Sequence, residues 1–183
     1  MSGAHGHVDH GGNKGVALLI SVLALVLAFS EMLGKGAQTN ALALNIEASN
    51  LWNFFQAKTI RQTVMRTAAE EIEVAGAVSE QAKKQIAKWK ETAQRYQSEP
   101  ETGEGREQLS ARAKAAEKKR DRSMAAYHHY ELASAVVQIA IVLASASIIT
   151  AMPALVWAAG VLGAVGVAFC VIGFWFPTAV HLF

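Results

Sequence analysis

The sequence lacks the short motifs that mark the common classes of enzyme. It contains no glycine-rich phosphate loop, no nucleophile elbow, no dinucleotide-binding fingerprint and no HExxH. The single cysteine, Cys170, excludes an intramolecular disulfide. Alternating apolar and polar runs, the signal for strands, are also missing. We therefore expect an all-α protein that is not an enzyme and that needs no cofactor.

Charge is almost absent from both ends of the chain. The 183 residues are 52% hydrophobic and only 17% charged, and 16 of the 17 Lys and Arg lie between Lys35 and Arg122. This asymmetry is typical of a membrane protein with a polar domain inserted between its spans. The basic run Lys118 to Arg122 lacks interleaved aromatic residues, so it favours anionic lipid over nucleic acid as a partner.

Three apolar runs are long enough to cross a bilayer. We predict transmembrane helices over residues 15–34, 132–152 and 155–176, with short tails over 1–14 and 177–183. A cleaved signal peptide is the alternative for the first run, but its apolar core is longer than usual. Pro153 predicts a tight turn between the second and third spans. The basic residues that flank the middle region indicate that residues 35–131 lie in the cytoplasm.

The polar middle, residues 35–131, is predicted to be a helical hairpin resembling a coiled coil. Gly34 and Gly36 predict a turn after the first span, with Thr39 or Asn40 capping a new helix. Ser79 is a candidate cap, and residues 98–107 read as a loop before a helix that continues into the second span. Apolar positions with a period of 3.6 predict one buried face: Ile60, Val64, Ala68, Ile72, Ala75, Val78, Ala82, Ile86, Trp89, Ala93, Tyr96.

The segment NIEASNLWNFFQAKTIRQ, residues 45–62, combines a charged stripe with an aromatic one. On a helix, Glu47, Asn50, Lys58 and Arg61 share a face, while Trp52 and Phe55 lie on another. One hypothesis is a juxtamembrane helix anchored in the interface or against a neighbouring protomer. The other is a site for an anionic ligand or lipid headgroup at Lys58 and Arg61.

This segment resembles the signature of a bacterial membrane-protein family known only as a domain of unknown function. The matching positions are Ile46, Glu47, Ala48, Ser49, Trp52, Gln56, Ala57, Lys58, Ile60 and Arg61. The chain departs from the pattern with Asn50 in place of an acidic residue and with Phe54 and Phe55 in place of a tyrosine pair. The resemblance implies a protein of the bacterial inner membrane and implies no activity.

The spans carry few candidates for function. Small residues at Gly160, Gly163, Ala164 and Ala168 allow close helix packing, either between copies of the chain or within one copy. Glu31 and Gln138 are possible intramembrane polar groups. Glu31 lies four residues before Lys35, a spacing that favours an ion pair at the membrane interface.

Two histidine-containing segments raise the question of metal binding. His5, His7 and His10 have ligand chemistry but no closed-site spacing, so a flexible polar tail is the simpler interpretation. YHHYE, residues 127–131, stands at the start of the second span, and adjacent histidines on a helix diverge by about 100°. Interfacial anchoring is the favoured interpretation there.

We therefore expect a non-enzymatic structural or accessory membrane protein. It would self-assemble through its helical domain and bind membrane lipids or another membrane protein. The alternatives are an oligomeric ion channel, lined by Glu31 and Gln138, and a metal-handling protein that uses the N-terminal histidines. The prediction includes a homo-oligomer because hairpin arms this poor in large apolar residues are marginal alone.

Overall fold

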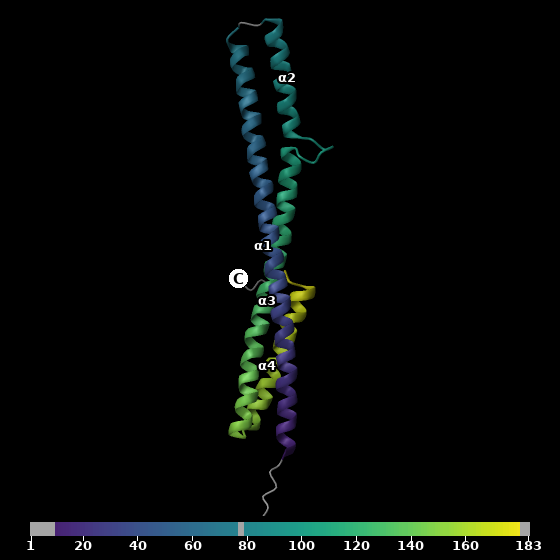
Figure 1. Ribbon diagram of the computed structural model, residues 1–183, viewed down its shortest axis with the longest axis vertical. Helices are drawn as coiled ribbons and strands as arrows, with labels where there is room; N and C mark the ends of the chain where they lie inside the picture. The colour runs from purple at the N-terminus through teal and green to yellow at the C-terminus, as the bar shows by residue number, and fades with distance from the viewer. Residues whose placement is uncertain (1–9, 77–78, 180–183) are drawn as a thin grey trace, which may run out of the picture. The chain divides into compact units, whose positions relative to one another are not determined.

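The computed structural model describes residues 10–76 and 79–179, with side chains from residue 14 onward. This part of the chain is helical, without strands, and forms four helices: α1 (His10–Val74), α2 (Glu80–Gln97), α3 (Arg106–Thr150) and α4 (Pro153–Trp175) (Figure 1). Helices α1, α3 and α4 are long and apolar enough to cross a membrane by length and composition. The all-α prediction is confirmed for these residues, and the three candidate spans are confirmed by length and composition.

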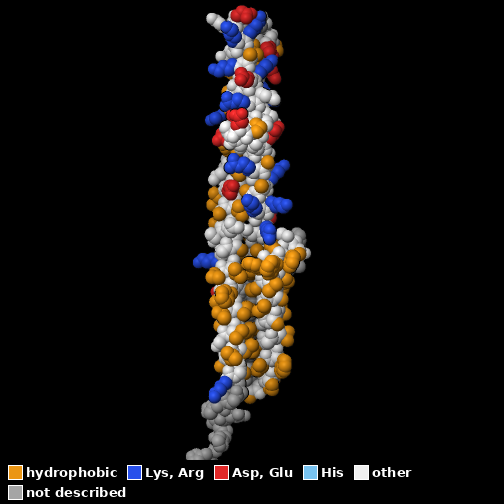
Figure 2. Space-filling view, turned by 90° about the vertical axis from the view of Figure 1, so that its right-hand side faces the viewer, with side chains coloured by type: hydrophobic (Ala, Val, Ile, Leu, Met, Phe, Trp, Pro, Cys, Tyr) orange, Lys and Arg blue, Asp and Glu red, His pale blue; other side chains and the backbone are white. Residues whose placement is uncertain are grey.

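The chain divides into two compact units. The apolar unit comprises residues 1–40 and 122–183, and the hairpin unit comprises residues 41–121. In Figure 2, hydrophobic side chains cover the visible face of the apolar unit, and Lys, Arg, Asp and Glu side chains gather on the hairpin unit. The charge asymmetry of the sequence therefore coincides with the division of the structure.

The predicted turn at Gly34–Gly36 is wrong, because α1 continues without interruption from His10 to Val74. Thr39 does not cap a helix: its hydroxyl donates to the carbonyl of Lys35 at 2.9 Å, as in a helix interior. Asn40 donates instead to Ser123 of α3, at 2.8 Å. A helical glycine costs about 1 kcal/mol relative to alanine, and packing against α3 outweighs that cost here.

The predicted cap at Ser79, the loop before α3 and the turn at Pro153 are present. Ser79 caps α2 by accepting a hydrogen bond from the backbone of Ala82 at 3.2 Å. The loop lies between Gln97 and Arg106, and α3 then runs unbroken into the apolar unit. In the connection between α3 and α4, Ala151 has a positive φ of 51°, and Pro153 is the first residue of α4.

The core of the apolar unit is small and depends on close approach of α4. Leu23, Val137, Ala140, Ala144 and Ala159 form its buried cluster. A Cβ on Gly163 would meet Leu23, one on Gly166 would meet Val137, and one on Gly173 would meet His129. Most large apolar side chains remain on the outside, which suits a unit surrounded by lipid.

In the hairpin unit, α2 and the first part of α3 both pack against α1, one after the other (Figure 1). The α1 positions facing them recur at steps of three and four and are all buried or half-buried: Ala41, Leu44, Ala48, Leu51, Phe55, Lys58, Gln62, Met65, Ala69, Ile72. We call this row the seam.

The predicted 3.6-residue face is correct for α2 and only partly correct on α1, where Ile72 belongs to the seam but Ile60 and Val64 do not; Val78 lies outside the described residues. Ile86 and Ala93 of α2 are buried, whereas Ile60 and Val64 of α1 are 65% and 60% exposed. The reason is that half of the seam positions are small or polar (Ala41, Ala48, Lys58, Gln62, Ala69), so the large aliphatic residues alone do not reveal which face of α1 is buried.

Candidate functional sites: a polar clasp and an inter-helix crevice

The middle of the seam is polar. Lys58 is only 5% exposed, and its ammonium lies 3.4 Å from Glu99 and 3.6 Å from Glu104. The same ammonium stands 5.2 Å from the ring centre of Phe54 and 5.6 Å from that of Tyr96. The cation is thus held by carboxylates of the α2–α3 loop and by aromatic faces.

Gln62 and Arg106 complete this arrangement. Gln62 is 2% exposed and donates to the backbone carbonyl of Ala93 at 2.9 Å. The guanidinium of Arg106 donates to the side-chain oxygens of Gln62 and Gln97, and it stacks on Phe55 at 4.9 Å. We name this group the polar clasp: Lys58, Gln62, Glu99, Glu104, Arg106.

The electrostatics of the clasp favour ionised Glu99. Partial desolvation acts to raise the pKa of the Glu99 carboxyl. Hydrogen bonds from Thr102 and Lys58 and the positive charges of Lys58 and Arg95 act in the opposite direction, and the pKa lies below its ordinary value. The clasp therefore fastens the loop to α1 as an ion pair.

The candidate residues of the segment 45–62 lie on two different sides of α1. Trp52, Phe55 and Lys58 face the packed side, where Trp52 donates to Glu117 at 2.8 Å and contacts Phe55 edge-on. Glu47, Asn50 and Arg61 are exposed. The expected charged face is therefore split, because Lys58 belongs to the seam.

Sequence reasoning missed Gln62, Glu99 and Arg106 as partners. A signal for Gln62 was present, since it lies four residues after Lys58 and continues the spacing of three and four. No local pattern ties Glu99 or Arg106 to α1. Both residues reach α1 only because the loop between α2 and α3 brings them back beside it.

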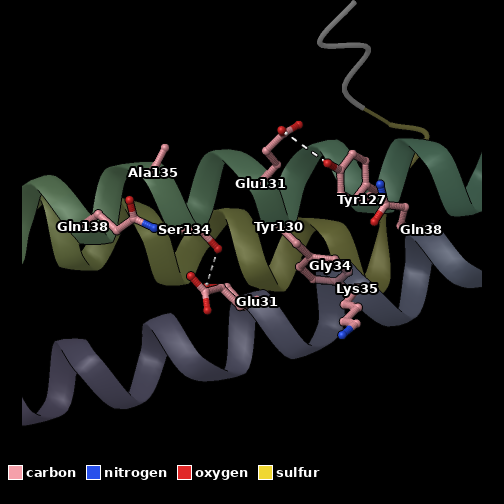
Figure 3. Close-up of a pocket in the computed structure, with 11 residues that line it drawn as sticks. Glu31, Gly34, Lys35, Gln38, Tyr127, Tyr130, Glu131, Ser134, Ala135 and Gln138 are labelled. Atoms are coloured by element: carbon pink, nitrogen blue, oxygen red, sulfur yellow. Dashed lines mark hydrogen bonds between the residues drawn. The ribbon is translucent and has the colours of Figure 1, made fainter.

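A second polar site lies in the apolar unit, between α1 and α3 (Figure 3). This crevice has a volume of about 470 Å³. Its lining residues are Ser30, Glu31, Gly34, Lys35, Gln38, Tyr127, Tyr130, Glu131, Ser134, Ala135 and Gln138. The two intramembrane polar candidates, Glu31 and Gln138, thus line one cavity.

The hydroxyl groups of Ser30 and Ser134, which line the crevice, already have hydrogen-bond partners. Ser30 is fully buried, its hydroxyl lies within hydrogen-bonding distance of the carbonyls of Val26 and Leu27, and it accepts from Ser134 at 3.2 Å. At the opposite end, Tyr127 donates to Glu131 at 3.3 Å. The negative charge of Glu131, with smaller effects of burial and of this hydrogen bond, raises the pKa of Tyr127.

Glu31, unlike Ser30 and Ser134, has no partner for its side chain among the described residues. The predicted ion pair with Lys35 is absent: among the described residues, Glu31 has no hydrogen-bond or ion-pair partner. In Figure 3 the side chain of Glu31 is directed toward α3, and that of Lys35 points away from the crevice. The amide of Gln138 likewise has no hydrogen-bond partner within the described ranges.

The YHHYE segment is divided between solvent and core. His128 lies 3.7 Å from Glu131, whereas His129 is 1% exposed and its Nε2 lies 3.3 Å from the carbonyl of Pro177. Tyr130 is buried beside Gly34 and Gly173. Within the part of the chain that the structure describes, no group of three His, Cys, Asp or Glu is arranged to hold a metal.

His5 and His7 lie outside the described residues, and only the backbone of His10 is described. The small residues of α4 separate into two sets. Gly163 is buried against Leu23, whereas Ala164 and Ala168 are exposed and a Cβ on Gly160 would meet nothing within 4 Å. Gly163 is thus used within one copy, and the other three face outward.

The family model described as Domain of unknown function (DUF4337) matches residues 12–176, nearly the whole chain. The chain belongs to this family. In this DUF4337 chain, the matched residues include the polar clasp, the crevice and all three candidate spans. No curated protein and no solved structure matches it.

Proposed function

We propose that this DUF4337 chain is a non-enzymatic structural or accessory protein of the bacterial inner membrane. It self-assembles through its hairpin unit, which lies in the cytoplasm, and it presents that assembly to lipids or to another membrane protein. The hairpin is a short intramolecular coiled coil, because its seam follows the heptad spacing.

The observation that carries this proposal is the outer face of α1, opposite the seam. It consists of Leu42, Ala43, Ile46, Ser49, Asn50, Asn53, Gln56, Ala57, Ile60, Thr63, Val64 and Thr67. None of these residues is charged, and all are exposed except the half-buried Ala57. Leu42, Ile46, Ile60 and Val64 are each more than half exposed.

Exposed aliphatic residues are expected on helices that face lipid, but on a polar unit they indicate an interaction surface. The seam cannot provide that surface, because α2 and α3 already cover it. The outer face of α3 is unsuitable for self-association, since Arg112, Lys114 and Lys118 are exposed there. Two copies that meet through the uncharged face of α1 avoid like-charge repulsion.

Cysteine cross-linking of the full chain in membranes tests this proposal. The background is Cys170→Ala, and the reporter is Ile60→Cys at the centre of the outer face. The proposal predicts a disulfide-linked dimer on mild oxidation. The matched control, Lys114→Cys, is exposed on α3 and should remain monomeric. Equal cross-linking at both positions, or none at Ile60→Cys, contradicts assembly through this face.

A second candidate function is an oligomeric ion channel. The observation that favours it is that Glu31 and Gln138 line the same crevice. It requires a water-accessible polar path, which these two side chains would supply. Flux into vesicles should then be lost in the double variant Glu31→Gln with Gln138→Ala, and unchanged flux removes this candidate.

A further inference from the structure

The crevice of the apolar unit has the properties of a ligand site. Its volume of about 470 Å³ lies in the range of small-ligand cavities. Space exists there because the facing residues are small, with Gly34 and Ser30 on α1 and Ser134 and Ala135 on α3. The ribbons of α1 and α3 flank it in Figure 3.

The chemistry inside the crevice favours a cation. Glu31 is directed into the space between the helices and has no ion-pair partner among the described residues. Lys35 is directed away, and Glu131 is engaged with Tyr127. An ionisable group near the end of a membrane span is costly unless it is paired, so an external cation would stabilise it.

The remaining polar atoms favour a cation that donates hydrogen bonds. Ser134 and Gln138 lie on α3, across the crevice from Glu31 on α1, and the side-chain oxygen of each can accept hydrogen bonds. A primary ammonium has three N–H donors for such acceptors, and a quaternary ammonium has none. Gly34, Ala135 and the ring of Tyr130 add apolar surface, which suits the carbon chain attached to an amine.

We propose that this crevice binds a primary ammonium group, carried either by a phospholipid headgroup or by a soluble amine. The carboxylate of Glu31 pairs with the ammonium, and Ser134 and Gln138 accept its remaining N–H groups. This binding is independent of self-association, since every lining residue belongs to the apolar unit of one chain.

The test uses the full chain in mild detergent and measures bound lipid by native mass spectrometry. The probes are phosphatidylethanolamine and phosphatidylcholine with identical acyl chains, which differ only in the ammonium. The site predicts about tenfold stronger binding of phosphatidylethanolamine. Free ethanolamine is added in a second series, and its ability to displace the lipid reports whether the ammonium suffices or the lipid is needed.

The variant Glu31→Gln keeps the shape of the side chain and removes the charge. It should reduce the preference for phosphatidylethanolamine to near unity. The matched control Glu47→Gln, exposed in the hairpin unit, should leave the preference unchanged. A filling variant, Ala135→Leu, should lower binding of both phosphatidylethanolamine and ethanolamine. Equal binding of the two lipids by the unmodified protein, or a preference that survives Glu31→Gln, overturns the proposal.

Discussion

The ammonium of Lys58 lies 3.4 Å from the carboxylate of Glu99, across the gap between α1 and the loop that follows α2. Lys58 is 5% exposed, an unusual position for a lysine. The pair fastens the returning chain to α1 in the middle of the seam. It adds a polar fastening to a seam whose other positions are mostly apolar.

Truncation of Lys58 should destabilise the hairpin. Lys58→Ala removes a buried aliphatic stem as well as a charge, and loss of the stem alone costs about 2 kcal/mol. Lys58→Met retains most of the stem, so the difference between the two variants separates packing from charge. Thermal unfolding of the full chain in detergent, followed by circular dichroism, measures both. Lys114→Ala, exposed on α3, serves as the control and should change little.

Acid should weaken the same contact. The pKa of Glu99 is lowered below its ordinary value of 4.5 in the folded chain. Its contribution to stability is therefore fully present above about pH 4.5 and is lost as pH falls through the folded pKa. The unfolding midpoint of the unmodified protein should fall more steeply below this pH than that of Glu99→Gln. Parallel curves for the two proteins would show that the carboxylate is not stabilised by the fold.

Adding a methyl group to α4 should destabilise the fold at Gly166 but not at Gly160. A Cβ on Gly166 would overlap the side chain of Val137, whose branched carbon leaves it little freedom to move. Gly166→Ala should cost about 1–3 kcal/mol through overpacking. A Cβ on Gly160 would meet nothing within 4 Å, so Gly160→Ala should leave the stability of one copy unchanged. Unfolding in mixed micelles compares them, and equal losses would contradict the observed packing.

The turn before α4 offers a stabilising change. Ala151 has a φ of 51°, which an alanine adopts at a cost of about 1–2 kcal/mol. Glycine adopts this conformation readily, although it also makes the unfolded chain more flexible. Ala151→Gly should therefore raise the unfolding temperature slightly, whereas Ala154→Gly, inside α4, should lower it. A lower unfolding temperature for Ala151→Gly would show that the positive φ is not strained.

The features that could be predicted from the sequence are those with a local cause. The spans follow from uninterrupted apolar runs, the start of α2 follows from Ser79, and the turn before α4 follows from Pro153. Each depends on residues that are adjacent in the chain. The family resemblance likewise depended on one contiguous segment.

The features that could not be predicted depend on contacts between distant segments. Gly34 and Gly36 predicted a break in α1 because their cost is local, while the packing against α3 that keeps the helix intact is not. Lys58 was grouped on one face with Glu47, Asn50 and Arg61, because its partners Glu99 and Glu104 arrive from a loop elsewhere in the chain. The crevice depends on which residues of α3 face Glu31.

Self-assembly through the uncharged face of α1 is the central claim, and native mass in mild detergent tests it most directly. For the unmodified full chain, we predict a single species whose protein mass is two or more times 19.6 kDa, in whole-number multiples. The variant Ile60→Lys places a charge on that face and should dissociate the species into single chains, while Lys114→Gln, exposed on α3, should not. A mass of one chain for the unmodified protein, or an assembly that survives Ile60→Lys, would contradict the claim.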